Sequence, residues 1–267
     1  MLRSMTVGAV ALFCSGAPVL AYTEEAAEVA APQAVQAAYD FYIGGLPIAA
    51  IEVTGRIGDE GYDVGSTVRT RGLLHTMTRG SVDASAAGRM IGPGRVMPGR
   101  YATEFSSTKG GRRVEIAYDG PTRMDVTMKP VPEPEPHDTD PSLHGGTLDP
   151  VSAALALMMP ADGDELCERT IPIFDGRRRY DVVLLPVERR PDDMARSPEP
   201  VWNTPLVRCF GVYERIAGFE PELQTRQRFF PFDIWFEQVK GSTLRRPVRI
   251  AGKTKLGFAI GNLRRDR

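Results

Sequence analysis

Hydrophobic and polar positions alternate along most of this chain in short runs. The first three runs, 38–43, 48–57 and 62–71, are separated by Gly44-Gly45 and by the turn 58–61. A period of two sends successive side chains to opposite faces of a strand. The opening of the chain therefore predicts a three-stranded antiparallel meander.

The same alternation continues to the end of the sequence. Glycine and proline separate most of the runs, at a spacing of roughly ten residues that is typical of all-β sheets and barrels. We therefore predict a mainly β fold: a curved antiparallel sheet or incomplete β-barrel with one or two packed helices. The further runs are 81–90, 100–107, 112–118, 123–128, 169–174, 177–185, 206–216, 229–239, 245–252 and 255–263.

One segment, 148–159, has the periodicity of a helix. Thr147 or Asp149 can cap its start, and Pro150 suits its first turn. A single apolar helix among many strands must pack against the sheet, so we expect it on the concave side. Its apolar stripe consists of Val151, Ala154, Leu155 and Met158.

The N-terminal residues have the pattern of an export signal. Arg3 is a short basic region, 6–13 is apolar, and Ala21 offers a small residue before a cleavage site at Tyr22. We expect a signal peptide at 1–21, cleaved near Ala21-Tyr22, and a periplasmic protein. A lipid anchor at Cys14 is disfavoured, because Phe13 stands where lipoprotein signals have a small residue.

The remainder is divided into a flexible leader at 22–37 and a single β-rich domain at 38–267. A proline-rich acidic stretch at 129–146 is interpreted as an exposed loop within this domain, since the β pattern resumes after it. No later stretch approaches the roughly 20 apolar residues of a membrane-spanning helix, so we expect no transmembrane segment in the mature chain.

After removal of the signal, Cys167 and Cys209 are the two cysteines that remain. An even count in an exported protein predicts a disulfide between them. The pair has no Cys-x-x-Cys spacing and no histidine nearby, which argues against a redox or metal site.

Composition limits the function classes. The 33 basic and 34 acidic residues nearly balance, which gives no reason to expect a nucleic-acid partner. With only three histidines and no nucleophile-elbow, zinc or phosphate-loop motif, we expect no catalytic residues, no metal and no cofactor. The chain is therefore expected not to be an enzyme.

The hairpin 174–180, with the turn residues Asp175 and Gly176, is the most specific motif. Together with Asp149-Pro150, the two cysteines and 216–218, it resembles an exported proteobacterial family known as domain-of-unknown-function family 3108. The resemblance covers about 38–263 and includes the opening segment 42–47. It implies a fold similar to the periplasmic lipoprotein carriers LolA and LolB, and it carries no established catalytic residues.

Two segments are candidate sites. The aromatic run 229–236 would place Phe230, Phe232, Ile234 and Phe236 on one face of a strand and Trp235 on the other. They form either one wall of an apolar ligand site or ordinary core. The second candidate is the strand that follows the Asp175-Gly176 turn, where Arg177 and Arg179 share one face. These arginines either clamp an anion or lipid headgroup, or pair with Asp175, Asp181 or carbonyl groups.

Compartment, predicted fold and aromatic strand together lead to one hypothesis. The protein is expected to bind a lipid or acyl chain in a concave sheet without catalysing a reaction. The alternative is a module of the cell envelope that binds a protein partner, with its concave face filled by its own helix. A large unfilled apolar pocket favours the first hypothesis, and a filled concavity with an exposed apolar edge favours the second.

Overall fold

The computed structural model describes residues 32–92, 94–159, 166–191 and 193–265. These residues form a mainly β protein with one antiparallel sheet that is not closed by strand pairing. The predicted signal peptide at 1–21, with Cys14, lies outside the described residues. None of the described helices is long and apolar enough to cross a membrane.

The sheet has thirteen strands in the order β7-β6-β5-β4-β3-β2-β1-β13-β12-β11-β10-β9-β8. The first and last strands therefore lie side by side in its middle, with Tyr39 opposite Leu263 and Phe41 opposite Gly261. The strands are β1 (Gln33–Ile43), β2 (Leu46–Ile57), β3 (Gly61–Thr70), β4 (Ser81–Gly92), β5 (Arg95–Ser107), β6 (Gly110–Asp119), β7 (Arg123–Lys129), β8 (Arg169–Phe174), β9 (Arg179–Pro186), β10 (Val207–Ala217), β11 (Phe229–Gln238), β12 (Arg245–Thr254) and β13 (Gly257–Leu263).

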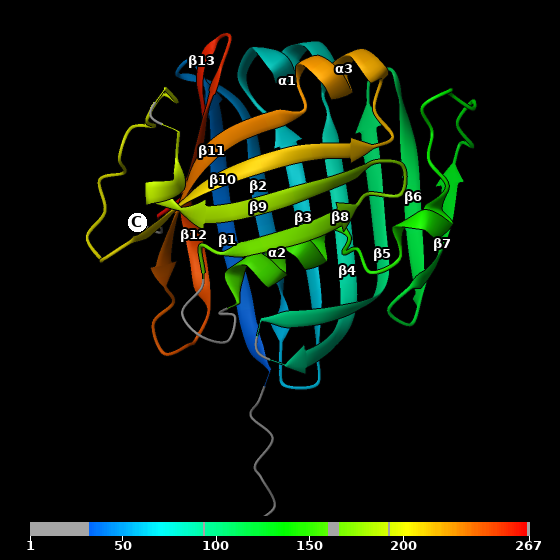
Figure 1. Cartoon of the computed structure of the whole chain (residues 1–267), viewed down its shortest axis with the longest axis horizontal. Coiled ribbons are helices and arrows are strands. Elements are labelled where there is room, and N and C mark those ends of the chain that lie inside the picture. Colours follow the sequence, from blue (N-terminus) through cyan, green and yellow to red (C-terminus); the bar gives the residue numbers. More distant parts are fainter. Residues whose placement is uncertain (1–31, 93, 160–165, 192, 266–267) are drawn as a thin grey trace, which may run out of the picture.

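The sheet folds over on itself. Strands β8 to β11 run across the front of β1 to β5 in Figure 1, so that two layers of one sheet enclose an interior. The tip of the β8–β9 hairpin reaches the other end of the sheet, where a Cβ on Gly176 would lie 2.5 Å from Val114 of β6. Residue Leu148 bridges to the β8 edge, accepting from Phe174 N–H and donating to the Pro172 carbonyl, both at 2.9 Å.

Helix α2 (Pro150–Met158) fills one half of this interior. Its N-terminus is capped by Asp149, whose carboxylate accepts from the backbone N–H groups of Val151 and Ser152 at 3.0 and 2.9 Å. The helix packs against β3, β4, β5, β8 and β12. Its core partners include Tyr62, Tyr101, Ile116, Ile171, Ile173 and Phe174.

The loop 187–206 covers part of the outer face of the sheet. It contains a short 3-10 helix, Val187–Arg189, and brings Arg190 and the Ser197 N–H to the carboxylate of Asp233 on β11. Arg208 of β10 also binds this carboxylate, at 3.1 Å. Asp233 is 1% exposed, so the loop seals a buried ion-pair cluster against the sheet.

Two short helices and a 3-10 turn complete the fold. Helix α1 (Gly72–Thr78) lies between β3 and β4, and α3 (Pro221–Arg226) lies between β10 and β11. Figure 1 shows both at the upper end of the molecule. The 3-10 turn Pro141–His144 packs beside β7.

The mainly β prediction, the helix after Asp149 and the Cys167–Cys209 disulfide are confirmed. The last residues of the predicted flexible leader, 22–37, belong to a strand, because β1 already begins at Gln33. Residues 33–37 have small and polar side chains that gave little strand signal, but their backbone pairs with Val53–Ile57 of β2. The turn between β12 and β13 lies at 255–256.

Candidate functional site

The half of the interior that α2 leaves open contains an apolar pocket of about 370 Å³. Its walls come from β1, β9, β10, β11, β12 and β13, and the end of α2 forms its floor through Leu157. Lys253 and Thr254 are exposed and mark its mouth. Apolar side chains in the wall include Phe41, Val182, Leu184, Phe230, Phe232, Ile234 and Ile250.

Alternation along β1 and β11 explains which side chains enter this pocket. Phe41 points inward, whereas its neighbours Asp40 and Tyr42 line a hollow on the outer face. On β11, Phe230, Phe232 and Ile234 line the pocket, as the spacing predicted. The pocket therefore forms where aromatic positions of the first and eleventh strands meet across the middle of the sheet.

Two strand glycines give the aromatic rings their room. A Cβ built on Gly211 would lie 2.3 Å from the ring of Phe232, and one built on Gly261 would lie 2.4 Å from the ring of Phe41. The two rings thus pack directly on the glycine backbone, where any other residue would place a side chain. This close packing keeps the rings out of the pocket and leaves its volume open. Glycine inside a strand often marks such a close approach.

Replacing Gly211 or Gly261 with alanine is expected to displace the covering ring into the pocket. We expect a loss of about 1–3 kcal/mol in the free energy of unfolding, the usual cost of overpacking. Gly65→Ala in β3 is the matched control, because the closest atom to its new Cβ lies at 3.7 Å. Urea denaturation of the three variants measures the difference, and equal stability of all three would contradict this account of the wall.

An aromatic row extends from the pocket toward the β8–β9 hairpin. The rings of Tyr213 and Phe230 meet edge to face at 5.9 Å, and those of Tyr180 and Tyr213 lie 4.8 Å apart. Burial raises the pKa of both tyrosine hydroxyls above the ordinary value. These phenols stay neutral near pH 7, so they present uncharged surface to the interior.

The structure places Trp235 and Phe236 away from the pocket. Trp235 faces the opposite side of β11, where its indole N–H donates to Glu199 at 2.9 Å and Arg208 lies over its ring. Phe236 is completely buried in a cluster with Leu184 and Cys209. Of the five residues proposed from the aromatic strand, three line the cavity and these two support the walls behind it.

Arg177 and Arg179 both pair with carboxylates of the protein. The guanidinium of Arg177 binds Asp138 at 2.9 Å and Glu135 at 3.0 Å, both in the acidic loop. Arg179 forms an ion pair with Asp181 and donates to the Tyr180 carbonyl at 2.7 Å. The hairpin turn at Asp175 and Gly176 thus anchors the 129–146 loop, and both arginines already have anionic partners.

A buried polar network surrounds the start of α2. Asp149 accepts a hydrogen bond from the Ser152 hydroxyl at 2.5 Å, and Ser152 in turn lies 2.6 Å from the Tyr62 hydroxyl. Burial raises the pKa of Asp149 to about 6, although the bonds from Ser152 and the helix N–H groups oppose the rise. The carboxylate is engaged by the helix terminus, so this network serves to fix α2 inside the sheet.

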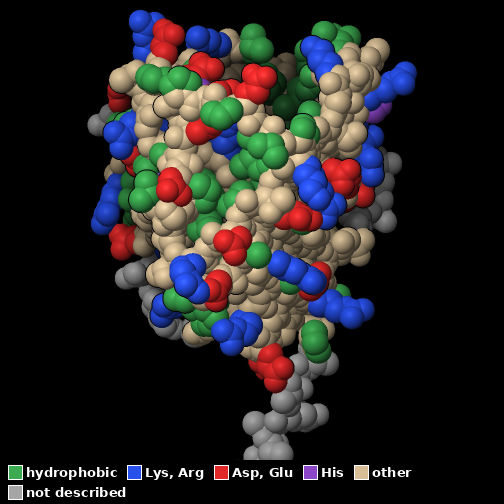
Figure 2. Space-filling view, turned by 90° about the vertical axis from the view of Figure 1, so that its right-hand side faces the viewer, with side chains coloured by type: hydrophobic (Ala, Val, Ile, Leu, Met, Phe, Trp, Pro, Cys, Tyr) green, Lys and Arg blue, Asp and Glu red, His purple; other side chains and the backbone are tan. Residues whose placement is uncertain are grey.

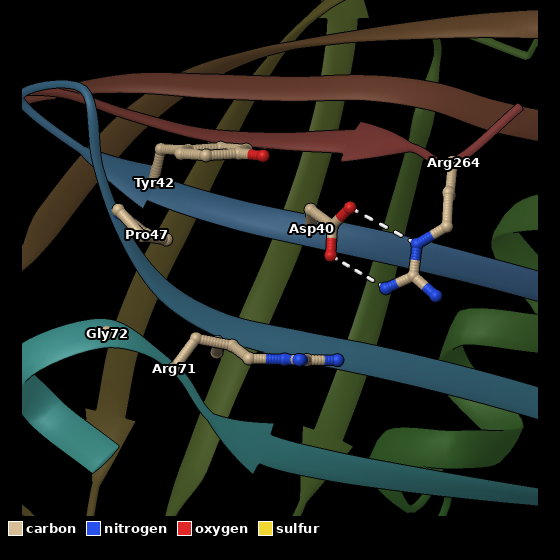
Figure 3. Close-up of a pocket in the computed structure, with 7 residues that line it drawn as sticks. Asp40, Tyr42, Pro47, Arg71, Gly72 and Arg264 are labelled. Carbon is tan, nitrogen blue, oxygen red and sulfur yellow. Dashed lines mark hydrogen bonds and ion pairs between the residues drawn. The ribbon is translucent and has the colours of Figure 1, made fainter. Parts of the chain in front are cut away.

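The outer face has a polar hollow of about 450 Å³ beside β1, lined by Asp40, Tyr42 and Arg71 among others (Figure 3). Arg264 donates to both oxygens of Asp40, at 2.7 and 3.2 Å, and this bond holds the pKa of Asp40 below its usual value. The negative charge of Asp40 is thereby balanced by the guanidinium of Arg264. The hollow differs from the interior pocket in both polarity and position, on the opposite face of the same strand.

A family model described as "Protein of unknown function (DUF3108)" matches residues 38–262. The chain belongs to this family. The match runs from β1 into β13 and so includes every strand that lines the pocket. No curated protein and no solved structure matches the chain.

The DUF3108 match confirms the resemblance found in the hairpin, helix and cysteine motifs. The sequence did not indicate Phe41, Ile250, Gly211 or Gly261 as pocket residues. A signal was present for the two glycines, since each interrupts an otherwise regular strand pattern. Phe41 carried no such signal, because its approach to β11 depends on the long-range pairing of β1 with β13. Ile250 lies opposite Ile234 in the β11–β12 hairpin.

Proposed function

We propose that this member of the DUF3108 family binds a single apolar ligand, an acyl chain or the acyl part of a lipid, without catalysing a reaction. The observation that carries the proposal is the apolar pocket beside α2. Its volume of about 370 Å³ falls within the roughly 300–1,000 Å³ typical of ligand sites. Its walls are almost wholly apolar, which suits a hydrocarbon chain and offers little to a polar metabolite.

The shape of the mouth supports an amphipathic ligand. Lys253 and Thr254 are the exposed polar residues at the opening, next to the half-exposed ring of Phe230. An acyl chain in the pocket would place its polar end at this opening, and the positive charge of Lys253 nearby favours a carboxylate or phosphate there. The ligand would lie below this end, against Phe41, Phe232 and Ile250.

The proposal includes export to the periplasm, which rests on the signal pattern of 1–21 and on the disulfide between Cys167 and Cys209. It also includes the likeness to LolA and LolB that the family resemblance implies. A curved sheet with a helix inside and an apolar cavity beside it is consistent with that likeness. A carrier of acyl chains between envelope sites fits such a compartment.

Filling the pocket tests the proposal. Ala259 lines the cavity on β13, so Ala259→Phe should occupy the space of the ligand, whereas Ala117→Phe places the same ring on the exposed surface of β6. We expect saturable binding of dansyl-undecanoic acid by the wild type and by Ala117→Phe. Binding by Ala259→Phe should be at least about tenfold weaker.

Native mass spectrometry of protein purified without detergent from an exporting host gives a second readout. We expect a lipid-sized adduct that leaves on denaturation, and less of it on Ala259→Phe. Failure of the wild type to bind the fluorescent acid, or equal binding by both variants, would refute the proposal.

A further inference from the structure

The turns of the sheet divide between two ends of the molecule, and the two ends differ in character. Successive turns of an antiparallel sheet lie at alternate ends. The β1–β2 turn, helix α1, the β5–β6 turn and the β12–β13 turn therefore share one end, which is uppermost in Figure 1. Backbone contacts join them: a Cβ on Gly44 would meet Leu256 O at 2.6 Å, and Thr108 N–H donates to Thr78 O at 3.0 Å.

This end exposes large apolar side chains, which we call the apolar rim. Helix α1 has no buried residue and projects Leu73 and Met77, which are 74% and 69% exposed. Figure 2 shows hydrophobic side chains along the upper end and inside a recess there. The rim consists of Leu46, Leu73, Met77, Phe229 and Leu256, each more than half exposed.

The same end is basic. The four segments 44–47, 71–80, 108–110 and 253–257 contain no aspartate or glutamate. The neighbouring α3 and β10 contribute Glu222 and Glu214, each paired with an arginine, at 2.9 and 2.6 Å, and the exposed Glu220 is the N-cap residue of α3. At the opposite end, the β2–β3 turn carries Asp59 and Glu60. The basic side chains of the four segments are Arg71, Arg79, Lys109, Lys253 and Lys255.

The rim lies beside the mouth of the pocket. Lys253 lies between the pocket and the turn that carries Lys255 and Leu256. Phe229 precedes Phe230, which lines the pocket wall. A partner bound to the rim would therefore meet the pocket opening directly.

We propose that the apolar rim docks on the surface of an anionic phospholipid bilayer, with the pocket mouth facing the membrane. Exposed leucine, methionine and phenylalanine tips among lysines and arginines match the boundary between headgroups and acyl chains. Each basic residue near an anionic surface strengthens binding, and salt screens it. The inference rests on the proposed acyl-chain function and adds the source of the ligand: an acyl chain passes between bilayer and pocket without crossing water.

Vesicle sedimentation tests the docking surface. The full chain after export should sediment with vesicles of phosphatidylglycerol and phosphatidylethanolamine, bind phosphatidylcholine vesicles weakly, and be released by high salt. Leu73→Ser/Met77→Ser should bind at least about tenfold more weakly, since two apolar side chains no longer enter the interface. Lys109→Gln/Lys255→Gln should lose about 30-fold on anionic vesicles.

Matched controls lie at the opposite end. Ile91 is exposed at the end of β4 and Lys240 is exposed in the β11–β12 turn, so Ile91→Ser and Lys240→Gln repeat the two kinds of change away from the rim. Both should bind vesicles like the wild type. Equal losses in the rim and control variants would overturn the proposal, as would absence of wild-type binding to anionic vesicles, which would assign the rim to a protein partner.

A second assay separates failure of the docking surface from failure of the acyl-chain site. Leu73, Met77, Lys109 and Lys255 do not line the pocket, so the rim variants should bind dansyl-undecanoic acid in solution like the wild type. Ala259→Phe should lose the fluorescent acid but still sediment with anionic vesicles. Loss of vesicle binding by Ala259→Phe would contradict the assignment of docking to the rim.

Discussion

Replacing Asp233 with alanine is expected to lower the free energy of unfolding by about 3–5 kcal/mol. The carboxylate is 1% exposed and is the shared partner of Arg190 and Arg208, whose side chains are also largely buried. Alanine would leave both guanidinium groups without this anion, and the Ser197 N–H would lose its acceptor. One of the contacts that hold the 187–206 loop against the sheet would be lost with them.

Urea denaturation followed by tryptophan fluorescence measures the change, because Trp235 lies on the same face of β11 as Asp233. Asp63→Ala is the matched control: its ion pair with Arg100, at 3.1 Å, is mostly exposed, and exposed pairs contribute about 0–1 kcal/mol. Asp233→Asn keeps an acceptor oxygen and should lie between the two. Similar midpoints for Asp233→Ala and Asp63→Ala would show that the buried cluster contributes little.

Removing the disulfide is expected to have an effect of similar size. Cys167 and Cys209 are 42 residues apart in sequence, and closing a loop of that length restricts the unfolded chain by about 4 kcal/mol. The bond also ties the segment before the edge strand β8 to β10. We expect Cys167→Ala/Cys209→Ala to melt about 8–16 °C below the wild type.

The reductant dithiothreitol provides the control for this prediction. It should lower the melting temperature of the wild type toward that of the double variant and leave the double variant unchanged. A wild type that melts at the same temperature with and without reductant, after its thiols have been shown to be free, would contradict the stabilising role.

Local features of the fold could be predicted from the sequence because each depends on residues close together in the chain. Alternation identified the strands, and Asp149-Pro150 identified the start of α2. The Asp175-Gly176 turn identified the β8–β9 hairpin. In the candidate site, alternation correctly placed Phe230, Phe232 and Ile234 on a face opposite to Trp235.

Features that depend on distant strands could not be predicted in this way. The pairing of β1 with β13 brings Phe41 to Ile250 and Ile234, and nothing near residue 41 encodes this neighbourhood. The apolar rim is assembled from turns more than 200 residues apart, so its leucines appear in the sequence as isolated surface residues. The sequence left Arg177 either an external anion or the nearby Asp175, Asp181 and carbonyl groups as partners. It pairs instead with Glu135 and Asp138 of a loop that showed no strand pattern.

The central position of the first and last strands has a consequence for the order in which the protein forms during synthesis. Hairpins such as β2–β3 and β9–β10 can form as soon as their residues are available, but the ladder between β1 and β13 needs residues 39–43 and 259–263 together. Contacts so far apart in sequence make folding slow and leave apolar surface exposed until late. The two halves of the sheet, and the pocket between them, are therefore completed only when the last strand arrives.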